Sequence, residues 1–201
     1  MSRPQSLGRA WSPGRSSRGG RSSRGGRSSR QGRGRRAAGW IAALTLTVLL
    51  GLALRFWGLQ GVRVTGTSME PTLRSGEIVL ATKFDYLAGT PARGDVVLCG
   101  FPGREGSYIK RVVGLPGETV RIVSGQTYID GQPLAEAYAT PADEDYETTL
   151  GADEYLVLGD NRPASYDSRE ADIGSLRAGD FHGRVRCVLW PPERLGAGMG
   201  K

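Results

Sequence analysis

The pattern of apolar and polar positions divides the chain into three regions. Residues 1–36 have no apolar periodicity, residues 37–54 form an uninterrupted uncharged run between Arg36 and Arg55, and short β-branched runs broken by Gly, Pro and Asp follow. Short runs of this kind predict strands, and few stretches have helical spacing. We therefore expect a mainly β domain over residues 55–192, preceded by one apolar helix.

Eight runs are expected as strands of that domain. They span residues 62–65, 78–82, 95–99, 108–113, 119–123, 127–129, 155–158 and 184–189. Residues 115–118 have Pro and Gly where a type II turn prefers them, and Asp-Gly at 130–131 suits a tight hairpin. Residues 135–153, rich in Ala, Asp and Glu, are expected to form a surface excursion, and residues 193–201 a C-terminal tail.

The apolar run 37–54 has the length of a membrane span. At about 1.5 Å per residue it reaches roughly 27 Å as a helix, just enough for the hydrocarbon core of a bilayer. A cleaved signal peptide is the competing interpretation, because a basic region followed by an apolar one is common to both. The run exceeds the usual apolar length of a signal, and residues 52–55 offer no small-x-small cleavage site. We therefore expect a retained transmembrane anchor, with Phe56 and Trp57 at the membrane interface.

Basic residues concentrate before the apolar run. Residues 1–36 hold eleven arginines, no lysine and no acidic residue, and residues 15–32 repeat a six-residue Arg/Ser/Gly unit, whereas the rest of the chain is mildly acidic. A segment with no apolar face to bury is expected to be disordered. The positive-inside rule places it in the cytoplasm and the β domain outside. We expect a single-pass protein of the plasma membrane.

Arginine- and glycine-rich segments also attract nucleic acids. This tail lacks interleaved aromatic residues, since Trp11 is the only one before Trp40. A topology signal or attraction to anionic lipid headgroups is therefore favoured, and nucleic acid is not expected as a partner. The alternative function is a membrane-tethered binding protein whose basic tail binds nucleic acid or lipid.

Candidate chemistry gathers in three segments of the β domain, GTSMEPTL at 66–73, YIKRVVGLPGE at 108–118 and GDNRPASYDSR at 159–169. The chain has a single histidine, so a nucleophilic serine needs another base, and lysine is the available type. Lysine serves only when neutral, so its pKa must fall from about 10.4 to about 7 or 8 through burial and local charge. Lys110 lies in an apolar run that could bury it, on the same strand face as Tyr108. Taken alone, the Lys110 segment would fit an exposed strand lysine better than a catalytic one.

Together the three segments and the anchor resemble type I bacterial signal peptidases, the membrane-anchored serine proteases that remove signal peptides from exported proteins. The resemblance runs from the anchor to near Pro191 and excludes the arginine-rich tail. It implies a signal-peptidase-like antiparallel β-rich catalytic domain that cleaves after small-x-small sites through an acyl-enzyme, without cofactor or metal. It implies exported preproteins and the lipid bilayer as partners, and these could extend to the secretion machinery.

The resemblance also assigns catalytic roles. It implies that Ser68 is the acylated nucleophile, Lys110 the general base and Ser165 the hydroxyl that orients the lysine amine. The Ser68 backbone N–H would form the oxyanion hole, with Thr67 as a helper.

Further residues are expected to shape the site. Two charge pairs are expected to hold it together, and four apolar or aromatic side chains are candidates to line the substrate pockets, although each could equally be ordinary core. The charge pairs are Arg111 with Asp160 and Asp167 with Arg169, and the pocket candidates are Met69, Leu73, Tyr108 and Ile109.

The chain departs from the family pattern in two places. Gly66 stands where some members have a serine that supplies a second oxyanion donor, and residues 170–174 replace the aromatic residue and glycine of many relatives. Lys83, Asp180 and His182 match no catalytic position and are interpreted as solvated or structural.

Two features leave alternatives open. Cys99 and Cys187 lie in apolar runs and could form a disulfide or remain buried thiols, and their spacing is not that of a metal site. Self-cleaving repressor-type proteins share the Ser-Lys chemistry on a related β scaffold. Those proteins are soluble and carry a DNA-binding domain, whereas this chain has an apolar anchor and no helix-turn-helix pattern.

Overall fold

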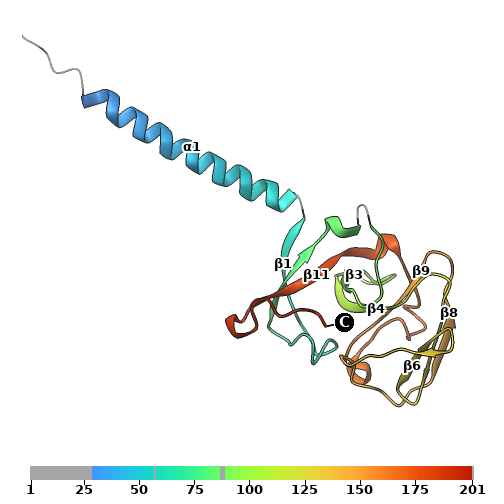
Figure 1. The fold of residues 1–201 in the computed structure, drawn as a ribbon. Helices are drawn as coiled ribbons and strands as arrows, with labels where there is room; N and C mark the ends of the chain where they lie inside the picture. Colours follow the sequence, from blue (N-terminus) through green and yellow to red (C-terminus); the bar gives the residue numbers. More distant parts are fainter. Residues whose placement is uncertain (1–28, 57, 87–88, 201) are drawn as a thin grey trace, which may run out of the picture. The chain divides into compact units, whose positions relative to one another are not determined.

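Antiparallel strands are the predominant regular structure of the described chain, as the sequence predicts (Figure 1). The computed structural model describes residues 29–56, 58–86 and 89–200. Its strands are β1 (Leu59–Arg63), β2 (Ile78–Thr82), β3 (Val96–Cys99), β4 (Tyr108–Gly114), β5 (Thr119–Val123), β6 (Gln126–Ile129), β7 (Gln132–Pro133), β8 (Tyr146–Thr149), β9 (Glu154–Leu158), β10 (Leu176–Arg177) and β11 (Phe181–Trp190).

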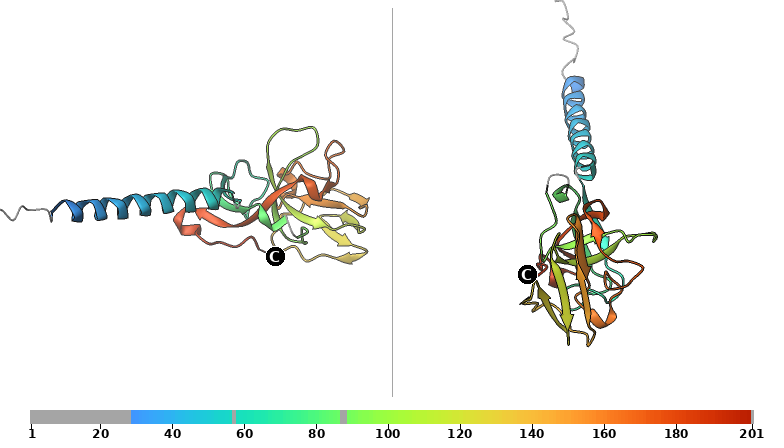
Figure 2. Two further views of the ribbon diagram at one scale, coloured as in Figure 1. Left: turned by 90° about the horizontal axis from the view of Figure 1, so that it is seen from above. Right: turned by 90° about the vertical axis from the view of Figure 1, so that its right-hand side faces the viewer.

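The strands form two antiparallel sheets. The larger has the order β1-β2-β11-β3-β4-β9-β10 and the smaller the order β7-β6-β5-β8. The smaller sheet lies at the end of the domain away from β1 (Figures 1 and 2). The long strand β11 pairs with both β2 and β3, and its register shifts against each of them, which bends a strand and increases its twist.

Most strand predictions agree with the structure within a few residues. Strands β2 and β5 have the expected bounds, whereas β1 begins three residues before the expected 62–65. Strand β8 lies within the expected surface excursion 135–153, and β7 and β10 were not predicted. Each of these missed strands is short, and the side chains of β8 alternate between half-buried and exposed positions, so their sequences carry little apolar periodicity.

Both predicted turns have the expected backbone. Gly117 has a φ of +81°, and the Glu118 N–H donates to the Leu115 carbonyl at 3.2 Å, as in a type II turn. Asp130 and Gly131 have φ values of +47° and +79°, which a type I′ hairpin requires.

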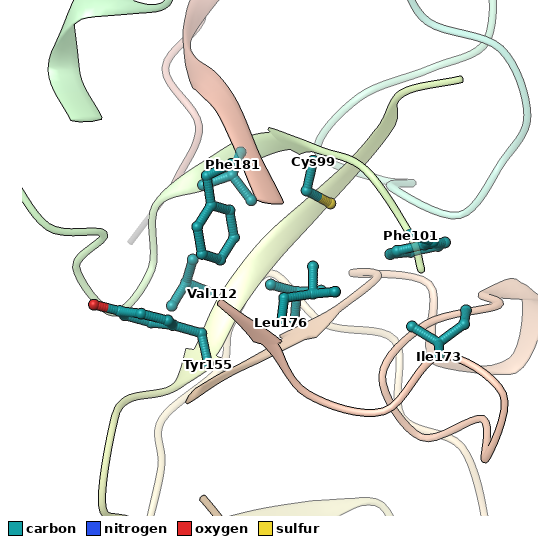
Figure 3. Close-up of a cluster of buried hydrophobic side chains, with 9 residues drawn as sticks. Cys99, Phe101, Val112, Tyr155, Ile173, Leu176 and Phe181 are labelled. Carbon is teal, nitrogen blue, oxygen red and sulfur yellow. The ribbon is translucent and has the colours of Figure 1, made fainter. Parts of the chain in front are cut away.

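Three apolar clusters surround strand β4. The largest contains nine buried side chains, and Figure 3 shows Phe181, Tyr155, Val112 and Leu176 pointing toward one another from different strands. On β4, Val112 belongs to this cluster, Ile109 packs against a second cluster and Val113 belongs to a third. Because close packing resists displacement, the strand that carries Lys110 is held firmly on both faces.

Helix α1 (Ser29–Phe56) covers the expected anchor and the last residues of the expected disordered tail. The chain divides into residues 1–46 and 47–201 by its internal contacts. Apolar side chains of α1, among them Trp40, Ile41 and Leu44, are exposed. Within the part of the chain that the structure describes, no helix has the length and apolar character needed to cross a membrane. Tail residues 1–28 and Trp57 lie outside the described residues.

Candidate active site

Ser68 lies in a turn shortly after β1, where Gly66 has a φ of +89° that favours glycine. Asn161, from the third sequence segment, holds this turn by two hydrogen bonds. Its backbone N–H donates to the Ser68 carbonyl at 3.0 Å, and its side-chain amide donates to the Thr67 carbonyl at 3.2 Å. The first and third segments are therefore joined directly beside Ser68.

Lys110 lies in the middle of β4 and is only 3% exposed. Its Nζ donates a hydrogen bond to Ser165 Oγ at 2.9 Å. Burial lowers the pKa of the Lys110 amine, while the negative charge of Asp167 partly opposes this change. A lysine with a lowered pKa is more often neutral near pH 7, which is the form that can accept a proton.

Ser165 connects the lysine to a buried carboxylate. Its hydroxyl donates to Asp167 Oδ2 at 2.6 Å, and the Gly159 N–H donates to the same oxygen at 3.0 Å. A hydroxyl carries one proton, so Ser165 can only accept a hydrogen bond from Lys110. The lone pair of a neutral Lys110 amine is therefore not used by Ser165 and stays available for another donor.

Arg169 keeps Asp167 ionised. Arg169 Nε donates to Asp167 Oδ1 at 2.9 Å. Burial by itself raises the pKa of the Asp167 carboxyl, but the Arg169 hydrogen bond and charge, with the bonds from Ser165 and Gly159, together lower it. The expected pair of Asp167 and Arg169 is thus present as an ion pair.

The other expected pair, Arg111 and Asp160, is fully buried. Arg111 Nε donates to Asp160 Oδ1 at 2.8 Å and Arg111 Nη2 to Asp160 Oδ2 at 2.7 Å, a two-bond geometry that fits guanidinium to carboxylate. Thr72 Oγ1, from the first segment, donates to Asp160 Oδ2 at 2.5 Å. The ring of Tyr138 stacks on the guanidinium, with the Arg111 Cζ 3.9 Å from the ring centre.

Ser68 and Lys110 both line one cavity of about 180 Å³. Of the four pocket candidates, Met69, Tyr108 and Ile109 line it, whereas Leu73 is fully buried in an apolar cluster. Thr67 is exposed and is not among the lining residues. The full lining is Val62, Arg63, Val64, Thr65, Gly66, Ser68, Met69, Ser107, Tyr108, Ile109 and Lys110.

Gly159 is required where the three segments meet. A Cβ at this position would lie 2.2 Å from Ser165 Oγ and 2.5 Å from the Ser68 carbonyl oxygen. These separations are far below ordinary contact, so a side chain here would push the hydroxyl or the nucleophile turn aside.

We therefore expect Gly159→Ala to lower kcat by about 100-fold or more, because displacing catalytic groups by about 1 Å has an effect of this size. Gly179→Ala is the matched control, since a Cβ there meets nothing within 4 Å. The measurement is steady-state cleavage of a peptide substrate, with circular dichroism to verify folding. Wild-type kcat in Gly159→Ala would contradict the geometry described above.

Two site residues were missed from the sequence. Besides Asn161, the buried Arg162 donates to the Gly159 carbonyl at 2.9 Å and to Glu136 Oε1 at 2.5 Å. It also reaches Thr127 of the smaller sheet at 3.2 Å. The only sequence signal for the role of Arg162 is that it is a charged residue in the middle of the third segment. The sequence contains no signal that Glu136 would pair with Arg162, because Glu136 lies outside all three segments.

The residues without an assigned role lie outside the hydrogen-bonded centre. His182 Nδ1 is 3.1 Å from Ser107 Oγ, Asp180 accepts a backbone N–H from Arg177, and Lys83 is exposed. Within the segment 170–174, Asp172 pairs with Arg104 at 2.7 Å.

The two cysteines are free thiols. Cys99 is part of the apolar core, and burial raises the pKa of its thiol to about 12. A thiol with this pKa stays protonated at neutral pH and is a poor nucleophile.

Comparison with known proteins identifies similar sequences. The family model described as signal peptidase, peptidase S26, matches residues 37–190. Signal peptidase I of Leptolyngbya laminosa is 36% identical over 166 residues, which cover 78% of this chain and 81% of that protein. Signal peptidase I of Bacillus licheniformis is 34% identical over 76% of this chain and 88% of its own length. Signal peptidase I T of Bacillus subtilis (strain 168) is 33% identical, with coverages of 76% and 84%.

Among solved structures, a signal peptidase I from Enterococcus faecalis V583 is similar, with 31% sequence identity and a TM-score of 0.42. The match covers 47% of this chain and 95% of that structure.

Proposed function

The chain belongs to the signal peptidase family, peptidase S26, whose members are serine endopeptidases, and we propose on that premise that Ser68 and Lys110 are the catalytic dyad with which it removes signal peptides from exported preproteins. One observation carries this proposal: a serine in a constrained turn and a buried lysine of lowered pKa line the same cavity. Because the chain belongs to this enzyme family, we drop two alternatives, a membrane-tethered binding protein and a self-cleaving repressor.

Acylation begins at Ser68. Its Oγ attacks the carbonyl carbon of the scissile peptide while its proton moves to the neutral Lys110 amine. In the described part of the chain nothing accepts the Ser68 backbone N–H, which supports its role as the oxyanion donor. The C–N bond then breaks, the leaving amine takes the proton from Lys110, and the signal peptide remains bound to Ser68 as an ester.

Deacylation uses the same lysine. A water molecule gives its proton to Lys110 and attacks the ester carbon, the C–O bond to Ser68 breaks, and Ser68 Oγ recovers the proton from Lys110. Ser165 is the positioning residue in both halves, because it accepts from Lys110 and is itself fixed by Asp167. The pairs of Asp167 with Arg169 and of Arg111 with Asp160 hold these segments in register.

The cavity dimensions support a preference for small side chains. This cavity of about 180 Å³ lies between β1 with the segment after it and the start of β4, and Val62, Val64, Met69, Tyr108 and Ile109 are the less polar part of its lining. A pocket of limited volume excludes large side chains more strongly than it selects among small ones. We propose that alanine-sized residues one and three positions before the cut occupy this space.

The test is cleavage of a purified preprotein by the purified enzyme. With Ala at positions −1 and −3 of the substrate, we expect a single cut directly after position −1, located by N-terminal sequencing or mass spectrometry. Replacing the −1 Ala of the substrate with Leu is expected to reduce kcat/KM by about 100-fold or more, since both side chains must share one cavity of about 180 Å³ and overpacking it displaces the scissile carbonyl from Ser68. Equal cleavage of both substrates would contradict the assignment of the pocket, and no cleavage of either would contradict the function.

Membrane anchoring is proposed for residues 37–54. Their uncharged sequence and the exposed apolar side chains of α1, such as Trp40 and Leu44, support it. The arginine-rich residues 1–36 would then lie in the cytoplasm and the β domain outside. The full chain is expected to stay in the membrane pellet after alkaline carbonate extraction, whereas a chain lacking residues 1–54 is recovered in the supernatant. Extraction of the full chain would contradict the anchor.

A further inference from the structure

The chain returns to the site after its last strand. Residues 191–200, which we name the C-terminal clasp, begin with a short 3-10 turn (Pro192–Arg194). The clasp then pairs with β11 by two backbone hydrogen bonds, from Gly196 N–H to the Val188 carbonyl at 2.9 Å and from Val188 N–H to the Ala197 carbonyl at 3.3 Å. From the sequence we expect only a C-terminal tail over residues 193–201.

The clasp completes the hydrogen bonding of Arg111. A guanidinium has five N–H donors, and Asp160 takes two of those of Arg111. The Gly94 carbonyl takes a third at 2.9 Å. The remaining two go to carbonyls of the clasp, Gly200 and Met199, each at 2.7 Å. Since Arg111 has no exposure to solvent, no water contact can replace these carbonyls while the clasp is in place.

The clasp also touches the segment that carries Ser68. Arg194 Nη2 donates to the Thr72 carbonyl at 2.7 Å, and Arg194 Nε pairs with Glu77 at 3.0 Å. Ala197 and Met199 pack against the apolar cluster that contains Met69 and Leu73. These contacts stabilise the turn that immediately follows the nucleophile.

We propose that the C-terminal clasp is a positioning element of the active site, which holds the Ser68 turn through Thr72 and the Lys110 strand through Arg111. A buried guanidinium with two unpaired N–H groups is strongly disfavoured, so loss of the clasp admits water to Arg111 and loosens its pair with Asp160. Both anchor points are close in sequence to the proposed catalytic residues, since Arg111 directly follows Lys110 and Thr72 lies four residues after Ser68. The effect on cleavage rests on the proposed function.

Loss of the clasp should also change the titration of Lys110. The charged and titratable groups that act on this amine are Asp167, Cys99, Arg169 and Asp160, and burial is the dominant influence. Water beside β4 reduces the burial, and an Asp160 less neutralised by Arg111 attracts the protonated amine more strongly. Both changes raise the pKa of Lys110, so the protonated form persists to higher pH.

The direct variant is a chain that lacks residues 196–201 and is otherwise unchanged. It removes both carbonyls and ends at Leu195, whose exposed position leaves the new carboxylate in solvent. A milder variant is Gly200→Val, because Gly200 has a φ of +58° that a β-branched residue does not tolerate. Gly198→Ala is the matched control, since a Cβ there meets nothing within 4 Å and its φ is ordinary.

Two readouts are measured on each folded variant. The first is steady-state cleavage of a preprotein as a function of pH. For the deletion we expect kcat to fall about tenfold or more, KM to change less than about threefold, and the acidic limb to move to higher pH. The second is the rate at which an amine-specific reagent labels Lys110 at each pH, followed by mass spectrometry, and its midpoint should move in the same direction. Gly200→Val should show smaller changes of the same sign, and Gly198→Ala none.

The outcomes separate the two proposals. A folded deletion variant with wild-type kcat and an unchanged labelling midpoint would overturn the proposal that the clasp positions the active site. A deletion variant with a lower melting temperature but the same two unchanged readouts would overturn it as well, because the clasp would then only stabilise the fold. If the deletion does not fold, Gly200→Val decides in the same way. A wild-type enzyme that cleaves no preprotein instead contradicts the proposed function, while the labelling midpoint still tests the clasp.

Discussion

Ser68→Ala is expected to abolish preprotein cleavage, with a loss in kcat of roughly 10⁴- to 10⁶-fold, as for the nucleophile of other serine proteases. The substitution removes the only oxygen proposed to attack the peptide carbonyl. It leaves the fold intact, since the contact that Ser68 makes with Asn161 uses the Ser68 main-chain carbonyl. The measurement is single-turnover cleavage with excess enzyme, with Ser75→Ala as the control because Ser75 is exposed in the same loop region.

Covalent trapping makes this prediction specific to the acyl-enzyme. When the wild-type reaction is stopped with acid in the first turnovers, the proteolytic fragment that contains Ser68 should gain the mass of the signal peptide acyl group. The Ser68→Ala enzyme should show no such adduct. An adduct on another residue, or full cleavage by Ser68→Ala, would remove Ser68 from its proposed role.

Lys110→Met is expected to lower kcat by about 10³- to 10⁴-fold, the upper range for loss of a general base. Methionine keeps the apolar stem and removes the amine, and Ser165 retains its hydrogen bond to Asp167. The residual rate should also lose its acidic limb, because no lysine remains to titrate. Lys83→Met is the control, since Lys83 is an exposed lysine.

The same substitution should not lower stability at neutral pH. Burial makes the pKa of Lys110 lower in the folded than in the unfolded chain. Between those two values the unfolded state binds more protons, so stability rises with pH there and burial of this lysine is unfavourable below that window. Removing the amine relieves this cost, and thermal unfolding at pH 7 should give a melting temperature equal to or above that of the wild type. A markedly lower value would mean that Lys110 serves mainly to stabilise the fold.

The sequence predicted most of the fold because buried strands such as β3 and β4 are rich in β-branched and other apolar residues. Strands β7 and β10 were missed because they have only two residues each, and β8 was missed because Tyr146 is its only large apolar residue. The start of β1 was missed for a similar reason. Its Leu59–Arg63 stretch contains Gly61 and has only half-buried and exposed side chains, so pairing with β2 fixes its bounds.

For the site, the three segments indicated which residues would meet, because the nucleophile, the lysine and the orienting hydroxyl lie within distinctive local sequences. Contacts made by remote groups were not predictable. Glu136 reaches Arg162, and the clasp carbonyls reach Arg111, only because the chain folds back on itself. Leu73 is a pocket candidate by its position in the motif, with ordinary core as the equal alternative, and its side chain lies fully buried in the core.

The most direct test of the account is the pH dependence of kcat/KM for a purified preprotein and the wild-type enzyme, compared with the pH dependence of Lys110 labelling. If neutral Lys110 takes the proton of Ser68, cleavage must rise with pH as the amine loses its proton. We predict that the acidic limb of kcat/KM and the labelling curve have the same midpoint, and that this midpoint lies below the ordinary lysine value of about 10.4. An ordinary midpoint for Lys110 labelling, together with full cleavage at pH values where the amine is protonated, would contradict the Ser68–Lys110 mechanism.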